Sequence, residues 1–311
     1  MRINKKIVFA FAFIFTGIQG CSSKGPVRQN SATVEASQII EDMKAGKNLL
    51  IENKTVNGDI DFTALGGSTK ESPGLNRVYV SSAVSFVNCI FNGRISSYSS
   101  SNDLATLCDF SKSLSFLECQ FKEDVLFRES IFHSNVIFNK SFFVKKATFE
   151  GSRFMGEAQF NGVSFGEEAR FQNIFFYNKT NFMDAAFGKT AYFQSSNFYA
   201  DAQLSTTRWE GYADFSLCVY HGGCFFNYSV FNNKAIFNNS TFRGRAEFFQ
   251  AKFTGNSEFK NCYYFGNVNM QAATVITGLD LSGSYYLGAI PDSTAFTRSE
   301  NTRIVMDQIK K

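Results

Sequence analysis

Residues 154–165 have the sequence FMGEAQFNGVSF, in which phenylalanine returns after six positions and then after five. This alternation can be followed in both directions, from Phe110 to Met270, and a large apolar residue stands at every step. The steps are Phe110, Phe116, Phe121, Phe127, Phe132, Phe138, Phe143, Phe149, Phe154, Phe160, Phe165, Phe171, Phe176, Phe182, Phe187, Phe193, Phe198, Leu204, Trp209, Phe215, Tyr220, Phe226, Phe231, Phe237, Phe242, Phe248, Phe253, Phe259, Tyr264 and Met270. Chance does not produce such a run, so it defines an internal repeat.

A small residue commonly stands two positions before the large one. Positions two apart on an extended strand point to the same face, whereas a helix would repeat its apolar residues every three or four positions. The repeat therefore predicts short β-strands, each with one large and one small side chain facing inward. The small residues are Ala147, Ser152, Ala158, Ala169, Ala185, Ala191, Ala202, Ala213, Ala235, Ala246 and Ala251.

Glycine or asparagine often occupies the third place of the six-residue units. Both residues accept the left-handed backbone of a tight corner, so we expect the extra residue of these units to form a left-handed corner bulge. The positions are Gly156, Gly211, Gly222, Gly244, Gly255 and Gly266, with Asn178 and Asn233 in two further units.

Small-x-Phe units at this spacing resemble the pentapeptide-repeat family, in a phenylalanine-rich form that alternates five and six residues. The resemblance covers residues 78–97 and 108–286, with an outlying unit at Ile60–Phe62. It implies a right-handed, four-sided β-helix, an all-β solenoid with one repeat per side and coils of about 22 residues stacked at strand spacing. Gyrase-protecting members are strongly acidic and cytoplasmic. This chain has a net charge of +4 and an export signal, so their function is not transferred to it.

Charged residues test this register independently. Steps of about 22 residues along one corner meet Glu123, Lys145, Glu167 and Lys189, and the neighbouring column meets Asp124, Lys146 and Glu168. Opposite charges therefore stack on each other, whereas like charges would repel across a ladder.

Six cysteines of the repeat region occupy the small inward position. We interpret them as buried core residues, with a disulfide framework as the alternative for an exported chain. No pair has the spacing of metal ligands, so the sequence predicts no metal and no cofactor. The six are Cys89, Cys108, Cys119, Cys218, Cys224 and Cys262.

The N-terminus has the parts of a secretory signal, with a basic start, an apolar run over Ile7–Ile18 and Gly20 before Cys21. The run is shorter than the roughly 20 residues of a membrane-spanning helix. The segment resembles a bacterial lipobox, which implies that residues 1–20 are a signal peptide and that Cys21 carries the lipid. Ser22 after the cysteine implies an outer-membrane lipoprotein, on the periplasmic or surface face of the cell envelope. The alternative is an ordinary signal peptide that contains a cysteine.

The remaining segments are predicted as tether, caps and loops. Residues 21–33 are polar and predict a flexible tether, and residues 34–62 an N-terminal cap with a helix ending before Gly46. The solenoid is expected over residues 63–290, with loops near 64–77 and 97–107. Residues 291–311 are expected to form a C-terminal tail or cap, with a short amphipathic helix over Thr302–Lys311.

Composition and motifs favour a role without catalysis. The 38 phenylalanines must line a core, and the charge of +4 gives no reason to expect nucleic-acid binding. Only His133 and His221 offer an imidazole for acid–base chemistry. The carboxylates alternate with lysines, and no phosphate loop or Ser/His/Asp arrangement is evident. The sequence therefore predicts no catalytic residues.

One outward row is the candidate binding surface. Tyrosine and arginine are favoured anchors at interfaces, so we expect this row to bind an envelope protein or a glycan. The alternatives are that its rings only stabilise the solenoid, which makes the protein a passive spacer, or that the chain is a carbohydrate-active β-helix enzyme. The row is His133, Met155, Tyr177, Tyr199, His221, Arg243 and Phe265, with Phe175 and Tyr263 in the row beside it.

Overall fold

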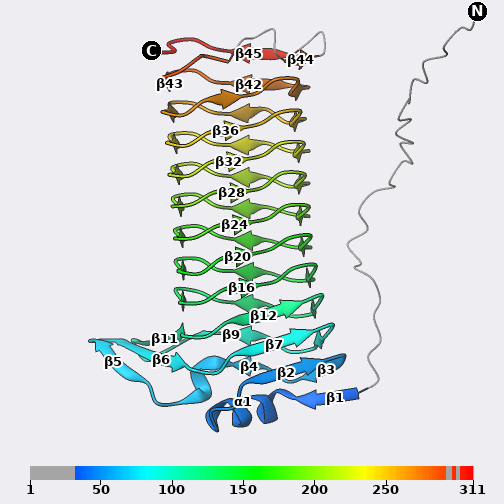
Figure 1. Cartoon of the computed structure of the whole chain (residues 1–311), viewed down its shortest axis with the longest axis vertical. Helices are drawn as coiled ribbons and strands as arrows, with labels where there is room; N and C mark the ends of the chain where they lie inside the picture. The colour runs from blue at the N-terminus through cyan, green and yellow to red at the C-terminus, as the bar shows by residue number, and fades with distance from the viewer. Residues whose placement is uncertain (1–31, 292–295, 299–301, 311) are drawn as a thin grey trace, which may run out of the picture.

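The computed structural model describes residues 32–291, 296–298 and 302–310 (Figure 1). Over these residues the chain winds into a tall four-sided solenoid whose walls are four parallel sheets. From Phe110 onward each strand pairs with the strand one coil later, as Phe143 does with Phe165 and Phe165 with Phe187. The predicted all-β solenoid of about 22 residues per coil is confirmed. The predicted signal peptide, Cys21 and residues 22–31 of the tether lie outside the described residues.

Sheets A and B form two neighbouring walls. Sheet A has 12 strands: β1 (Ala32–Glu35), β3 (Lys54–Asn57), β8 (Ile90–Phe91), β13 (Gln120–Phe121), β17 (Phe142–Phe143), β21 (Ser164–Phe165), β25 (Ala186–Phe187), β29 (Arg208–Trp209), β33 (Val230–Phe231), β37 (Lys252–Phe253), β41 (Thr274–Val275) and β44 (Thr297–Arg298). Sheet B has 10 strands: β2 (Leu49–Glu52), β7 (Val84–Val87), β12 (Leu114–Leu117), β16 (Val136–Ile137), β20 (Ala158–Gln159), β24 (Thr180–Asn181), β28 (Ala202–Gln203), β32 (Cys224–Phe225), β36 (Ala246–Glu247) and β40 (Val268–Asn269).

Sheets C and D complete each coil. Sheet C has 11 strands: β4 (Ile60–Asp61), β9 (Ile95–Ser96), β14 (Val125–Leu126), β18 (Ala147–Thr148), β22 (Ala169–Arg170), β26 (Ala191–Tyr192), β30 (Ala213–Asp214), β34 (Ala235–Ile236), β38 (Ser257–Glu258), β42 (Gly278–Asp280) and β45 (Arg303–Val305). Sheet D has 12 strands: β5 (Thr69–Ser72), β6 (Leu75–Val80), β10 (Tyr98–Ser101), β11 (Leu104–Phe110), β15 (Ile131–Phe132), β19 (Arg153–Phe154), β23 (Phe175–Phe176), β27 (Asn197–Phe198), β31 (Val219–Tyr220), β35 (Thr241–Phe242), β39 (Tyr263–Tyr264) and β43 (Tyr285–Tyr286).

The core is a set of aromatic columns, one behind each sheet. Every large residue of the repeat from Phe110 to Met270 is buried. Rings of successive coils stack nearly parallel, as Phe171 does on Phe193 with centroids 4.8 Å apart. Rings of neighbouring columns meet edge to face, as Phe182 does with Phe193 at 5.5 Å. Both geometries are favourable for aromatic quadrupoles, so the strand spacing and the ring stacking support each other.

The serines of the small inward position do more than fill space. Ser196 Oγ donates a hydrogen bond to the Phe171 carbonyl at 2.7 Å and accepts one from the Ile174 N–H at 3.1 Å. Ser141, Ser152, Ser240 and Ser284 also donate to a carbonyl of an earlier coil. Because these backbone groups are buried and need hydrogen-bond partners, the serine hydroxyls that bridge them tie successive coils together.

The corner prediction for the six-residue units is wrong. Gly156, Gly244 and their equivalents do not have a positive φ. Glycine is needed there because the backbones approach closely: a Cβ on Gly244 would lie 2.2 Å from the Gly222 carbonyl oxygen. The left-handed residues belong to the five-residue units, where most of them are not glycine, as Lys140 and Leu217 show with φ of 55° and 59°.

A helix covers the N-terminal end of the solenoid, and strands extend its sheets at the C-terminal end. Helix α1 (Ala36–Lys44) buries Ala36, Ile39, Ile40 and Met43 against the first coil, and Gly46 follows it with φ of 74°. The predicted N-terminal helix is therefore confirmed, although Val34 and Glu35, at the start of the predicted cap, belong to β1. The prediction of a C-terminal helix is wrong, because β45 pairs with β42 instead. Without β45, backbone groups at the edge of β42 and just after it would have no partner. The Leu281 N–H is one of them, and it donates to the Val305 carbonyl at 2.8 Å.

The two predicted loops form an arm of β-structure instead. A 3₁₀ turn, η1 (Phe62–Leu65), precedes the hairpin of β5 and β6, and β10 and β11 form a second hairpin. The hairpins lie side by side because β6 and β11 pair in parallel over six residues each. The arm projects at one edge of the solenoid (Figure 1). The prediction of loops failed because pairing between two insertions is a tertiary contact.

Candidate functional site

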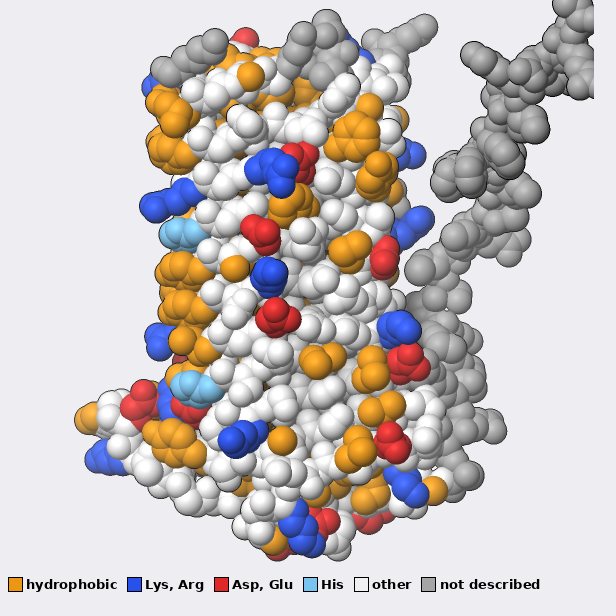
Figure 2. Space-filling view, in the orientation of Figure 1, with side chains coloured by type: hydrophobic (Ala, Val, Ile, Leu, Met, Phe, Trp, Pro, Cys, Tyr) orange, Lys and Arg blue, Asp and Glu red, His pale blue; other side chains and the backbone are white. Residues whose placement is uncertain are grey.

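The predicted outward row lies on one wall of the solenoid. Each residue directly follows the inward side chain of a sheet D strand, so successive members are one coil apart. Met155, Tyr177, Tyr199 and Phe265 are 40–47% exposed. Figure 2 shows the hydrophobic side chains gathered along one edge between the two histidines. We call His133, Met155, Tyr177, Tyr199, His221, Arg243 and Phe265 the sheet D row; its six steps span about 29 Å at strand spacing.

The central rings of the row stack on each other. Tyr177 and Tyr199 have centroids 4.9 Å apart at an interplanar angle of 4°, and Tyr199 and His221 are 4.6 Å apart at 9°. Because the ring faces cover one another, the row presents ring edges and hydroxyls to solvent. A sugar or a nucleobase needs an open ring face for stacking, so the centre of the row suits the side chains of a protein better.

Charged groups lie along the wall on either side of this stack. His133 Nε2 lies 2.8 Å from Oδ1 of Asp109, a largely buried carboxylate on β11. Burial and the neighbouring Arg243 guanidinium lower the pKa of His221 from its usual value of 6.5. His221 is therefore neutral at pH 7 and stacks as an uncharged ring.

The row beside it adds further aromatic surface. Arg153 lies over the Phe175 ring at 5.9 Å, and the Phe175 ring is 6.3 Å from that of Tyr177. Tyr263 is 50% exposed and packs loosely against Tyr285 at 6.4 Å. The predicted neighbours thus do lie on the same wall.

The arm widens this wall at its N-terminal end. Strands β6 and β11 begin in the arm and end in sheet D, and Tyr79 on β6 is 56% exposed. Arg77 and Glu71 brace the first hairpin with an ion pair at 2.7 Å. Sequence reasoning missed the arm, although Pro73-Gly74 and Asn102-Asp103 are turn signals that would have supported hairpins.

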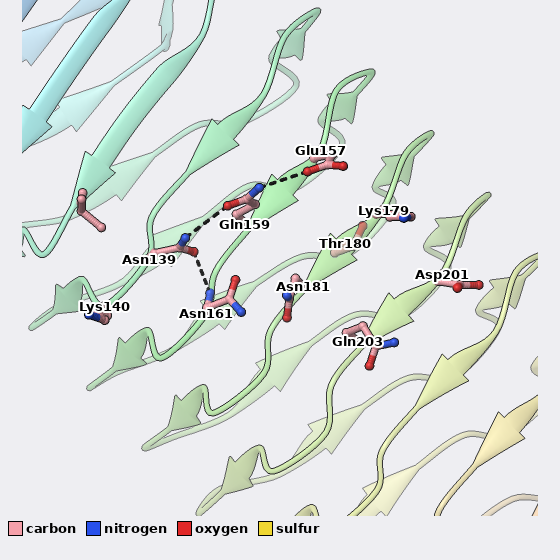
Figure 3. Close-up of a pocket in the computed structure, with 11 residues that line it drawn as sticks. Asn139, Lys140, Glu157, Gln159, Asn161, Lys179, Thr180, Asn181, Asp201 and Gln203 are labelled. Carbon is pink, nitrogen blue, oxygen red and sulfur yellow. Dashed lines mark hydrogen bonds between the residues drawn. The ribbon is translucent and has the colours of Figure 1, made fainter.

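A second feature, a polar groove, lies on sheet B (Figure 3). It encloses about 650 Å³, and its floor carries amide side chains on successive coils. Sequence reasoning missed it, yet its amides recur at the coil period and are visible once that period is known. The groove is lined by Leu117, Asn139, Lys140, Glu157, Gln159, Asn161, Lys179, Thr180, Asn181, Asp201 and Gln203.

Other candidate chemistry is limited over the described part of the chain. The six cysteines of the repeat are buried thiols that form no disulfide, as the core interpretation predicts. Residues 32–291, 296–298 and 302–310 contain no cluster of His, Cys, Asp and Glu that could hold a metal ion. Within the same residues no helix has the length and apolar character needed to cross a bilayer.

The charge columns also confirm the register. Lys145 Nζ lies 2.5 Å from Glu123, and Lys146 Nζ lies 3.7 Å from Glu168. These side chains are exposed, so each pair contributes well under about 1 kcal/mol to stability.

Together these features define a four-sided parallel β-solenoid with an aromatic core, a class that typically serves as a non-catalytic scaffold. Residues 116–164 and 204–252 match the family model described as pentapeptide repeats (9 copies), and the Phe-rich repeat continues through the coils around both segments. The chain therefore carries pentapeptide repeats in both of these segments. Comparison with curated proteins and with solved structures gives no match.

Proposed function

We propose that this solenoid is a non-enzymatic scaffold of the bacterial cell envelope, anchored through lipid on Cys21, that binds a protein partner through the sheet D row. The observation that carries the proposal is the stripe of half-exposed aromatic side chains along one rigid wall. Large side chains of this kind rarely stay exposed in a continuous line unless they meet a partner.

The chemistry of the row supports a protein partner. Its tyrosines present ring edges and hydroxyls, and Arg243 adds a cation at one end of the stack. Tyrosine and arginine are the residue types that most often anchor interfaces. The rings are also held in place by stacking at 4.6–4.9 Å, so binding would cost little side-chain entropy.

The arm gives the same wall a second contact region. Because sheet D continues into β6 and β11, a partner on the row would reach the exposed Tyr79 and the first hairpin without turning a corner. Insertions on a rigid scaffold commonly carry function.

A double substitution tests the row. The full-length protein with Tyr177→Ser and Tyr199→Ser should lose a partner that the unchanged protein captures after crosslinking in intact cells. The matched control is Tyr192→Ser with Tyr212→Ser, an outward aromatic pair at 6.5 Å whose first member lies on sheet C. Equal capture by both variants would reject the row as the binding surface.

The anchor is tested separately. Cys21→Ala should move the protein from the membrane fraction to the soluble fraction of the envelope, and Cys89→Ala should not. Protease treatment of intact cells then assigns the face of the membrane: digestion indicates the surface, and protection the periplasm. Membrane retention of the Cys21→Ala protein would contradict lipid anchoring.

A passive structural spacer is the second candidate. The parallel stacking of Tyr177, Tyr199 and His221 supports it, because cross-strand ring pairs stabilise a sheet by themselves. Under this reading the double substitution in the row lowers stability by about 1–2 kcal/mol, and no crosslinked partner depends on it.

A further inference from the structure

We propose that the polar groove of sheet B binds a neutral oligosaccharide, at a site separate from the sheet D row. The groove lies on a different wall and uses none of the row's residues. The inference is independent of the proposed protein partner.

The floor of the groove is a ladder of amides in parallel register. Gln159 pairs with Asn181 and Asn181 with Gln203, so these side chains lie side by side at strand spacing. Asn139 and Asn161 form a second line beside them (Figure 3). From Asn139 to Gln203 the amides cover four coils, or about 14 Å.

Part of this ladder is already paired, and part is open. Asn139 donates to Gln159 Oε1 at 3.2 Å, and Gln159 donates to Glu157 at 3.0 Å. Along the described chain, the side-chain amides of Asn161 and Gln203 have no hydrogen-bond partner. Each open amide offers a donor beside an acceptor. Sugar hydroxyls also donate and accept, so an oligosaccharide would match both groups.

The charges at the rim are balanced. Lys140 and Lys179 face Glu157 and Asp201 around the same groove. Lys140 is paired with Glu118 at 3.3 Å, and Asp201 accepts a hydrogen bond from the Gly223 N–H at 2.9 Å. A site for a phosphate or an acidic polymer would carry an excess of positive charge, so the balance favours a neutral ligand.

Aromatic residues stand beyond the C-terminal end of the groove, where the Arg245 guanidinium lies over the Phe225 ring at 5.3 Å. Phe225 stands in register one coil beyond Gln203. Tyr228 is 51% exposed and meets Phe249 edge to face at 5.7 Å and 87°. Because these two rings are perpendicular, they do not cover each other face to face as the rings of the sheet D row do. Ligand sites combine such apolar surfaces with a few placed polar groups.

The backbone excludes strand addition as the mode of binding. An added peptide strand needs unpaired N–H and C=O groups at a sheet edge. In the groove these groups are used between coils, as in Phe160 N–H to Asn181 carbonyl and Phe182 N–H to Gln203 carbonyl, each at 2.7 Å. A ligand there meets side chains only.

Calorimetric titration of the full-length protein, in a detergent without sugar groups, tests the inference. The probes are cellotetraose, chitotetraose and maltotetraose, with tetragalacturonate as the acidic comparison. At least one neutral tetrasaccharide should bind, its disaccharide should bind more weakly, and tetragalacturonate should bind at least tenfold more weakly. No binding by any neutral probe, or stronger binding of the acidic one, would overturn the proposal.

Variants then locate the site. Asn161→Ala with Gln203→Ala should weaken binding at least tenfold without changing the unfolding midpoint, because neither side-chain amide has a partner to lose. The row variant Tyr177→Ser with Tyr199→Ser should bind the sugar normally. Unchanged sugar binding by the groove variant would overturn this site. If the row variant keeps its protein partner, only the proposal for the sheet D row fails.

Discussion

Replacing Phe193 by alanine tests the central claim about the core. The Phe193 ring is fully buried and stacks between Phe171 and Phe215 at 4.8 and 4.9 Å. It also receives the edges of Phe182 and Trp209 at 5.5 and 5.9 Å. Removing a buried phenylalanine costs about 3–5 kcal/mol. We expect the upper part of this range, because the hydrogen-bonded ladders hold the coils apart and prevent the cavity from closing.

Equilibrium urea unfolding measures this loss. The single tryptophan, Trp209, reports on the same part of the core by fluorescence, and circular dichroism follows the sheets. The midpoint should fall by the lost free energy divided by the slope m, with m unchanged. Phe193→Leu should cost less, and it keeps the test valid if the alanine variant does not fold.

The matched control is the next residue along the chain. Gln194 points away from the core and is partly exposed, and its buried side-chain oxygen has no hydrogen bond to lose, so Gln194→Ala should change stability by less than about 1 kcal/mol. Equal losses at Phe193 and Gln194 would refute the inward assignment and, with it, the alternation of large residues on which the register rests.

Three further predictions concern the corners, the inter-coil hydrogen bonds and the row. Gly244→Ala should cost about 2 kcal/mol or more, because its Cβ would meet the Gly222 backbone. Gly162→Ala, at φ of 61° with its nearest contact at 3.6 Å, should cost about 1 kcal/mol; the reverse order in urea unfolding would contradict the corner geometry. Ser196→Ala should lower the free energy of unfolding by only about 1 kcal/mol, because the Ile174 N–H can then donate to the carbonyl three residues back, as the Val163 N–H does at 3.3 Å. Unchanged stability would show that the serine hydroxyls do not tie the coils together. The pKa of His221 is lowered by burial and by Arg243. The stability that the folded protein gains with a neutral His221 is therefore present above pH 6.5, and it is lost as the pH falls below that value. In an NMR titration Arg243→Gln should raise the pKa of His221 yet leave it below 6.5, because burial is the larger cause of the lowered pKa. An unchanged pKa would show that Arg243 does not contribute to the shift.

Much of the fold follows from local chemistry. The spacing of Phe154, Phe160 and Phe165 predicts strand faces because side chains alternate along a strand. The charge pair Glu123–Lys145 supports the coil length because stacked neighbours must not repel. Neither inference needs the tertiary structure. The sheet D row followed from the same register, and its binding role stays a prediction.

The rest depends on which segments meet in space. The sequence alone determined the period, the inward columns and the outward row, because these repeat with the chain. Only the tertiary structure decided the corner chemistry, the arm and the closed ring faces of the sheet D row. Glycine at position 244 looked like a left-handed residue, but it is set by how closely the Gly222 backbone approaches. The insertions looked like loops, yet β6 and β11 pair. The ring faces of Tyr177 and Tyr199 are closed because stacking between coils covers them. Contacts between different coils determine the close approach at Gly244, the pairing of β6 with β11 and the closed ring faces. The residue pattern within one coil does not specify these contacts.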